Sequence, residues 1–248
     1  MDNPYDLVIT AVSERADLLE STLLALLAAV DQQPRQIYVH EDVRPGTSPG
    51  HIADVLRSHG IKAEHRITNP ARGMGCGMLW GFETAQAEYV LYTQEDWLPV
   101  RAIPVADTLA VMHEYGLHHI RWNKRKTMRC KHEDKPSMTW WKVEKEIGGH
   151  PLCVSDHWYT QTSLWRRSIA LPGLRATAGL SNSAGSFIAA YNHWMFKTYG
   201  DGRAWNDQEM RHELLRTYIW GPIAEPAYIK HVGSRRGTGK IKDHLEEK

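Results

Sequence analysis

The sequence contains few cysteines, almost no net charge and no long hydrophobic run. Its three cysteines, Cys76, Cys130 and Cys153, lie far apart and match no zinc-ligand spacing, which favours free thiols over disulfides or a zinc site. Lys and Arg number 30 against 29 Asp and Glu, so net charge does not indicate a general affinity for nucleic acids or membranes. The longest apolar stretch, Leu23 to Val30, is far shorter than the roughly 20 residues of a membrane-spanning helix.

The N-terminus also lacks the basic and apolar regions that make up a secretory signal. Together with the free thiols, this predicts a cytoplasmic protein without a transmembrane segment. The composition is otherwise that of an ordinary globular protein, with 42% hydrophobic and 24% charged residues. A chain of 248 residues has room for one well-filled α/β domain and little room for a second. We therefore treat residues 1–248 as a single domain.

Short apolar segments typical of strands alternate with helix-like segments through the first 100 residues or so. This alternation predicts an α/β fold with a mostly parallel central sheet flanked by helices. Ligands of such sheets bind at the carboxyl ends of the strands. Beyond about residue 120 the alternation fades, and a clear helical pattern returns only near the C-terminus. We expect strands over 6–12, 36–40, 62–67, 88–93 and 227–230, and helices after the first strand, over 51–59 and over 206–218.

The stretch 69–97, NPARGMGCGMLWGFETAQAEYVLYTQEDW, combines three features that work together. A loop with several glycines, including Gly73, allows the backbone to approach a ligand closely. A helix follows, and a buried strand then ends at Gln94, Glu95 and Asp96. Acids at the end of a buried strand are poorly solvated, and a divalent cation that bridges them to a diphosphate offsets that cost. The alternative is a pair of solvated loop acids, which is the commoner case for an isolated Glu-Asp.

In this order, the elements resemble glycosyltransferase family two and related GT-A enzymes. The sequence pattern of these enzymes has an Asn and glycines, a helix, a strand that ends in an acidic D-x-D-type motif, and a later His-x-Gly. Here the acidic motif is Gln94-Glu95-Asp96, and His231-Val232-Gly233 supplies the later element. Gln94 replaces the first acid, which leaves Asp96 as the expected metal ligand. The resemblance covers residues 5–100 well and residues 205–235 loosely.

The resemblance implies a GT-A fold, the Rossmann-like fold of nucleotide-diphospho-sugar transferases. It implies an enzyme, a hexosyl- or pentosyltransferase, that moves a sugar from a nucleoside-diphosphate donor, with UDP expected, to a hydroxyl acceptor. Residues 1–100 would bind the nucleotide sugar, and residues 101–248 would bind the acceptor. Asp96 and His231 would hold Mn²⁺ or Mg²⁺ against the diphosphate.

Several donor contacts are carried over from the same resemblance. In the first loop, Arg15 would contact a phosphate or the base, and after the second strand Asp42 would bind the nucleoside. The alternatives are that Arg15 pairs with Glu20 or another surface acid, and that Asp42 only begins a turn. The full set of predicted donor contacts is Thr10, Ala11, Val12, Glu14, Arg15, Asp42, Arg72, Gly73, Gln94, Glu95, Arg235 and Arg236.

Two acids near the C-terminus are candidates for the catalytic base. Asp207 and Glu209 lie at the start of the predicted helix over 206–218, where the family places an E-D-type base that accepts the acceptor's proton. This role would give inversion at the anomeric carbon. The alternative is that both acids only complement the positive end of the helix, worth at most about 1 kcal/mol. Downstream, Arg235 and Arg236 lie in a glycine-flanked loop that would close over the diphosphate.

The acceptor is left open between a glycan and a hydroxymethylated base in phage-type DNA. The segment 121–131, RWNKRKTMRCK, is basic and contains Trp122, with Trp140 and Trp141 beyond it. Aromatic rings stack on sugars and on bases alike, and Lys and Arg bind phosphates of either acceptor. The alternative is that this segment is only a solvated, charged loop.

Two other functions compete with glycosyl transfer. A sugar-nucleotidyltransferase also uses a glycine-rich loop and metal-binding acids, but its usual G-G-x-G-T-R-like loop is replaced here by AVSERAD after the first strand. A non-enzymatic nucleic-acid-binding module would use the segment 121–141, and it would show no metal-dependent binding of nucleoside diphosphates.

Overall fold

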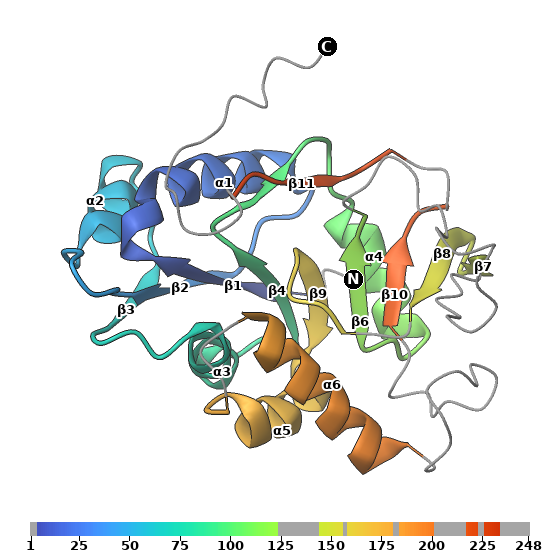
Figure 1. Ribbon diagram of the computed structural model, residues 1–248. Coiled ribbons are helices and arrows are strands. Elements are labelled where there is room, and N and C mark those ends of the chain that lie inside the picture. Colours follow the sequence, from blue (N-terminus) through green and yellow to red (C-terminus); the bar gives the residue numbers. More distant parts are fainter. Residues whose placement is uncertain are drawn as a thin grey trace, which may run out of the picture.

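The structure is a computed structural model that describes residues 4–123, 144–155, 158–180, 184–200, 217–222 and 226–233. Within these residues, a nine-stranded mixed sheet crosses the molecule and carries helices on both faces (Figure 1). Its strand order is β3-β2-β1-β4-β9-β6-β10-β8-β7. The predicted α/β fold with helices on both sides of a central sheet is confirmed.

The first four strands of this order form a parallel half-sheet that determines the position of the functional site. They are β1 (Tyr5–Val12), β2 (Gln36–Asp42), β3 (Glu64–Thr68) and β4 (Tyr89–Gln94). All their pairings are parallel, with β1 between β2 and β4. Each strand lies within two residues of its predicted bounds. The buried runs of β1, β2 and β4 leave a clear local pattern, whereas β3 is a mostly unburied edge strand.

The second half of the sheet is mixed. It consists of β9 (Ser163–Arg166), β6 (His119–Trp122), β10 (Thr217–Trp220), β8 (His150–Ser155) and β7 (Glu144–Ile147). β9 runs antiparallel to β4 and to β6, so β4 and β6 point in the same direction. Two further strands, β5 (Trp97–Pro99) and β11 (Ile229–His231), form a separate antiparallel ribbon. The prediction of a helix over 206–218 is wrong at its end, because Thr217 and Tyr218 are buried in β10; residues 206–216 lie outside the described ranges.

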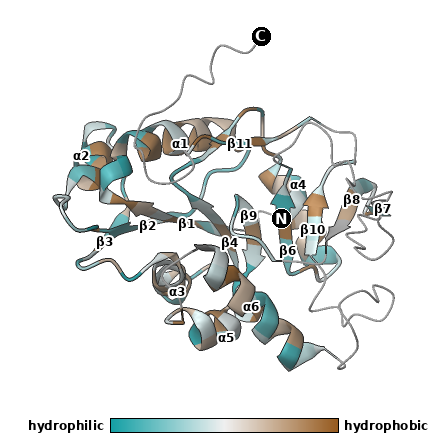
Figure 2. Cartoon of the chain, in the orientation of Figure 1, coloured by the Kyte–Doolittle hydropathy of each residue, from teal (hydrophilic) through white to brown (hydrophobic). Residues whose placement is uncertain are grey.

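Helices cover the two faces of the sheet in two groups. The first group is α1 (Ala16–Ala29), α2 (His51–Ser58) and α4 (Val105–Glu114), and the second is α3 (Met74–Thr84), α5 (Arg167–Thr177) and α6 (Ala184–Tyr199). Alternate residues of β1 enter the two cores, as a strand's period of two requires: Leu7 and Ile9 pack under α1, and Val8 packs under α3. Figure 2 shows hydrophobic residues along these inner strands. The sequence pattern did not predict α5 and α6.

Helix α3 lies unusually close to the parallel strands because glycines face them. A Cβ atom on Gly81 would lie 2.4 Å from Cγ1 of Val8, and one on Gly77 would lie 2.5 Å from Nδ1 of His40. The helix therefore approaches β1 and β2 to a distance that no larger residue permits. This packing fixes where the N-terminus of α3 meets the carboxyl ends of the strands.

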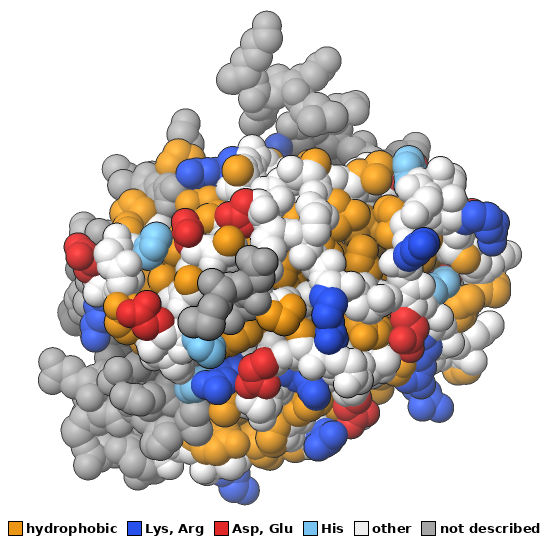
Figure 3. Space-filling view, turned by 180° about the vertical axis from the view of Figure 1, so that it is seen from behind, with side chains coloured by type: hydrophobic (Ala, Val, Ile, Leu, Met, Phe, Trp, Pro, Cys, Tyr) orange, Lys and Arg blue, Asp and Glu red, His pale blue; other side chains and the backbone are white. Residues whose placement is uncertain are grey.

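The surface shows no separation of charge on the face that Figure 3 displays, where basic and acidic side chains are interspersed. None of the helices in the described ranges is long and apolar enough to cross a lipid bilayer.

One buried histidine makes the stability of the fold depend on pH. His119 is fully buried, with its ring centroid 5.0 Å from that of Trp158 and 4.6 Å from that of Trp165. Burial lowers the pKa of His119 well below 6.5, and the charge of Arg121 lowers it further. The folded protein therefore holds this imidazole neutral, whereas the unfolded chain protonates it near pH 6.5.

We predict that His119→Phe weakens the acid sensitivity of folding. Below pH 6.5 the unfolded wild type binds one proton more at this site than the folded protein, so stability falls as pH falls. That loss approaches about 1.4 kcal/mol per pH unit once the unfolded imidazole is fully protonated. Denaturant titrations between pH 7 and pH 5 should give a shallower slope for this variant. The exposed His113→Gln should keep the wild-type slope, and identical slopes for all three proteins would contradict the assignment.

Candidate active site

The carboxyl ends of β1, β2 and β4 meet at one edge of the sheet, because the three strands are adjacent and parallel. The register pairs Val12 with Asp42 and Thr10 with Gln94 at that edge. Three segments predicted to bind one ligand, the first loop, the end of β2 and the acidic motif after β4, are therefore neighbours in space. This is the edge at which α/β sheets bind ligands.

The acidic motif is buried and is held by a cation from the first loop. Glu95 and Asp96 are each 6% exposed. Nη1 of Arg15 lies 3.2 Å from Oε1 of Glu95 and 3.1 Å from Oδ2 of Asp96. The alternative that these acids are solvated loop residues is therefore wrong, and so is the alternative that Arg15 pairs with Glu20, which instead contacts His59.

His231 completes the cluster from the far end of the chain. Its Nε2 atom lies 3.1 Å from Oδ2 of Asp96, although the two residues are 135 positions apart. The β5–β11 ribbon causes this contact, because it pairs His231 with Trp97 and brings their ring centroids to 4.6 Å. The backbone N–H of Val232 then donates to the carbonyl oxygen of Asp96 at 2.9 Å.

The glycine of the His-x-Gly element is required by the same geometry. A Cβ atom on Gly233 would lie 2.3 Å from Oδ2 of Asp96, a separation that real side chains do not adopt. Any larger residue would push the carboxylate away from its partners. In the His-x-Gly pattern, the histidine thus contacts Asp96, and the glycine two residues later leaves room for the Asp96 carboxylate.

One oxygen of Asp96 has no partner among the described residues. Its Oδ1 atom is buried and accepts no hydrogen bond from them. A buried acceptor left unsatisfied costs about 1–3 kcal/mol, more when it is charged, so this oxygen is suited to a ligand or cation. Among the described residues no group of three His, Cys, Asp or Glu side chains forms a complete metal site. Asp96 and His231 fit two positions of a shell that diphosphate oxygens could complete.

Burial also changes the protonation of the neighbouring acid. The pKa of Glu95 is raised from 4.5 to about 7, first by burial and then by the charge of Asp96, while Arg15 opposes the change. Near neutral pH the Glu95 carboxyl therefore exchanges between its two forms. It can donate a hydrogen bond to a ligand oxygen when protonated and accept one when ionised.

The acids at the end of β2 hold the surrounding loops in place. Asp42 accepts hydrogen bonds from the backbone N–H groups of Arg72 at 3.1 Å and Gly73 at 2.8 Å, which fixes the glycine loop before α3. Oε1 of Glu41 accepts bonds from Ser13 at 2.7 Å and from the Gly50 N–H at 3.1 Å. Sequence reasoning gave Glu41 no role of its own, because nothing local marks an anchor between distant loops.

The remaining donor residues differ in what they can offer a ligand. The Thr10 hydroxyl hydrogen-bonds to Tyr92 at 2.7 Å, and Ala11 is buried, so this end of β1 offers a ligand mainly backbone groups. Glu14 pairs on the surface with Arg44 at 2.6 Å. Val12, the last residue of β1, is only partly buried. The side chain of Gln94 donates to the carbonyl oxygen of Thr160 at 2.8 Å, which ties the end of β4 to the segment before β9.

Four predicted site residues lie outside the described ranges: Asp207, Glu209, Arg235 and Arg236. Most of the basic segment does so as well, and only residues 121–123 of it are described. Trp122 is 0% exposed in β6, and Arg121 lies with its guanidinium carbon 3.9 Å from the ring centroid of Tyr159. Trp122 is therefore a core residue and cannot stack on a sugar or a base.

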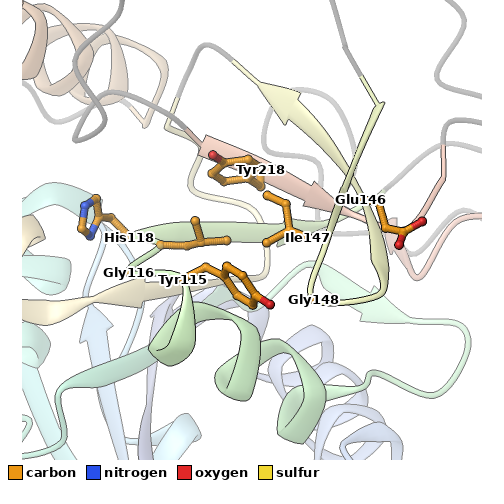
Figure 4. A pocket seen from close by; sticks show the side chains of 8 residues that line it. Tyr115, Gly116, His118, Glu146, Ile147, Gly148 and Tyr218 are labelled. Carbon is orange, nitrogen blue, oxygen red and sulfur yellow. The ribbon is translucent and has the colours of Figure 1, made fainter.

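A cavity of about 310 Å³ lies elsewhere in the described structure. Figure 4 shows the rings of Tyr115 and Tyr218 facing it together with Ile147, while His118 and Glu146 lie at its margins. It shares no residue with the acidic cluster, and its lining comes from the turn before β6, the β7–β8 hairpin and β10. The acidic cluster, unlike this cavity, brings buried charged side chains together, so it is the stronger candidate site.

Comparisons with known proteins bear on the fold. No protein-family model and no curated protein sequence matches the chain. Among solved structures, residues 1–349 of S. aureus TarS in complex with UDP-GlcNAc match with a TM-score of 0.56 and 12% identity, over 95% of this chain and 60% of that one. The mannosyltransferase PcManGT from Pyrobaculum calidifontis, in complex with GDP-Man and Mn²⁺, matches with a TM-score of 0.57 and 13% identity, over 95% of this chain and 59% of that one.

A further S. aureus TarS structure matches with a TM-score of 0.53 and 12% identity, over 91% of this chain but 36% of its own length. The chain thus spans between 36% and 60% of the length of these three structures. Both proteins are glycosyltransferases of the GT-A type. At such low identity the likeness concerns the fold, and the chain accordingly has the GT-A glycosyltransferase fold that its sequence motifs predicted.

Proposed function

We propose that this chain transfers a sugar from a nucleoside-diphosphate donor to a hydroxyl acceptor. The observation that carries the proposal is the buried carboxylate of Asp96, which has one oxygen without a partner among the described residues and lies at the ligand-binding edge of a GT-A fold. Solved structures of the same fold contain UDP-GlcNAc and GDP-Man, which supports this donor class. We take a UDP-sugar as the donor expected from the sequence.

The residues of the edge divide the work of donor binding. Backbone groups of Thr10, Ala11 and Val12 and the side chain of Asp42 face the nucleoside. Arg15 and the guanidinium group of Arg72 would face the diphosphate and bind its oxygens. Gly73, whose N–H already donates to Asp42, would let the backbone approach the donor closely. Asp96 and His231 would hold Mn²⁺ or Mg²⁺, which when bound neutralises charge on the departing diphosphate. Arg235 and Arg236 would close the site from the last loop.

We predict that one nucleoside-diphosphate sugar stabilises the protein in the presence of Mn²⁺ and is slowly hydrolysed by it. Asp96→Asn keeps the size of the side chain but removes its charge. The affinity for the donor in the presence of Mn²⁺ and the rate of donor hydrolysis should therefore each fall by about 100-fold or more. A panel of UDP-, GDP-, ADP- and TDP-sugars is screened by thermal shift and by release of the diphosphate. The exposed Asp17→Asn serves as the matched control and should behave as wild type. A folded protein that responds to none of these sugars would refute the proposal.

We also propose that Asp207 or Glu209 is the base that takes the proton of the acceptor hydroxyl. Loss of a general base costs about 10²- to 10⁴-fold in rate. One of Asp207→Asn and Glu209→Gln should therefore lower kcat by at least about 100-fold while donor binding is unchanged, and the other should have a small effect. NMR of the product should show inverted anomeric configuration. Retention, or full activity of both variants, would refute this assignment.

The acceptor that we propose is a glycan rather than DNA. The burial of Trp122 removes one of the aromatic side chains that would contact a base, and net charge gives no general attraction to phosphate. Activity on a glycan library should change little between about 50 and 200 mM salt. A DNA acceptor makes the opposite prediction, a fall of several orders of magnitude over that range, because phosphate contacts release counterions. Transfer to hydroxymethylated DNA with that salt dependence would overturn the glycan assignment.

A further inference from the structure

Arg15 occupies the place next to the acidic pair where a bound cation is expected. Its Nη1 atom contacts both carboxylates, at 3.2 Å from Glu95 and 3.1 Å from Asp96. The side chain of Arg15 is 14% exposed and the side chains of the two acids are 8% exposed, so the contact is shielded from solvent. Arg15 is therefore a genuine counter-ion of the pair and not a surface partner.

The rest of the guanidinium group is uncommitted. Nε and Nη2 of Arg15 make no hydrogen bond to any residue in the described part of the chain. Arg15 also ends a short 3-10 turn, Ser13–Arg15, between β1 and α1. The side chain can therefore turn towards a phosphate at the same edge without disturbing either element.

Arg15 and a divalent cation cannot share the carboxylates as they stand. Oδ2 of Asp96 already contacts Arg15 and His231, both at 3.1 Å. A metal ion on either oxygen of Asp96, including the unpartnered Oδ1, would place two positive charges within a few ångströms of one another in a poorly solvated site, where they repel strongly. Metal binding is therefore favoured when Arg15 leaves.

We infer that Arg15 is an exchangeable counter-cation: it neutralises Glu95 and Asp96 in the empty enzyme and moves to the donor diphosphate when a divalent metal binds. The inference rests on the proposed function, because it takes Asp96 as the metal ligand. Two consequences follow. The buried acids remain compensated when no metal is bound, and metal binds weakly until a diphosphate offers Arg15 a new anionic partner. Binding of metal and of nucleoside diphosphate is then mutually strengthening.

The test measures Mn²⁺ binding directly, by electron paramagnetic resonance of the free ion, with and without UDP or GDP. In the wild type, the nucleoside diphosphate that binds should tighten Mn²⁺ binding by at least about fivefold. Arg15→Gln removes the competing charge, so Mn²⁺ alone should bind at least about fivefold tighter than to wild type, and the gain from the nucleotide should largely vanish. Arg15→Lys retains the charge and should restore weak binding of Mn²⁺ alone. Arg57→Gln, an exposed arginine on α2, is the matched control and should behave as wild type.

Thermal unfolding provides a second readout. Without metal, Arg15→Gln leaves the two buried acids without the charge of the arginine, so it should unfold at a lower temperature than wild type. Adding Mn²⁺ should raise the unfolding temperature of the variant to that of the wild type. If this variant requires Mn²⁺ to fold at all, the exchange is supported; if Mn²⁺ does not rescue it, the exchange is refuted. Equal or weaker Mn²⁺ binding by Arg15→Gln, beside Asp96-dependent binding by wild type, would also refute it.

Failure of the proposed function has a different signature, read on the wild type alone. None of the nucleoside diphosphates of the donor panel would then bind, and Asp96→Asn would leave any Mn²⁺ binding unchanged. That outcome refutes the donor site and the exchange together, whereas failure of the exchange alone leaves the Asp96-dependent binding of Mn²⁺ and nucleotide intact.

Discussion

Two adjacent carboxylates buried at the end of β4 are the constraint on which the site depends. Glu95 and Asp96 cannot both be ionised away from water unless positive groups surround them. Arg15 reaches both acids from the loop after β1, and His231 reaches Asp96 through the β5–β11 ribbon. The acidic pair therefore holds together segments from the beginning, the middle and the end of the described chain, and the fold must bring all three to one edge.

The parallel half of the fold could be predicted because its signals are local. Strands β1, β2 and β4 each contain a run of apolar residues, and the helices after β1 and β3 repeat their apolar residues with helical spacing. The second half gave no such signal. Strands β6, β9 and β10 have four residues each, too few to show a period, and their partners are distant in sequence. Helix α5 contains Pro172, which conceals its helical character from a reading of the sequence.

The site was predictable in its components but not in its contacts. The order of glycine loop, acidic motif and His-x-Gly identified the residues, yet only the structure shows that Gly233 makes room for Asp96 and that Arg15 compensates the pair. Asp42 was assigned to the nucleoside, and the structure adds that its carboxylate already fixes the glycine loop. Trp122 is a case in which the sequence misled. An aromatic residue within a basic segment suggested a binding surface, but Trp122 belongs to the core.

The departure from the D-x-D pattern at Gln94 has a physical reason in this structure. The Gln94 amide donates to the carbonyl oxygen of Thr160, a contact that a carboxylate at this position would replace with repulsion between two acceptors. A third acid would also add negative charge beside Glu95, whose pKa is already raised to about 7 by burial and by Asp96. One arginine already faces two acids here, and a third acid would leave more negative charge without a cationic partner. The neutral residue at position 94 and the arginine at position 15 are thus parts of the same charge balance.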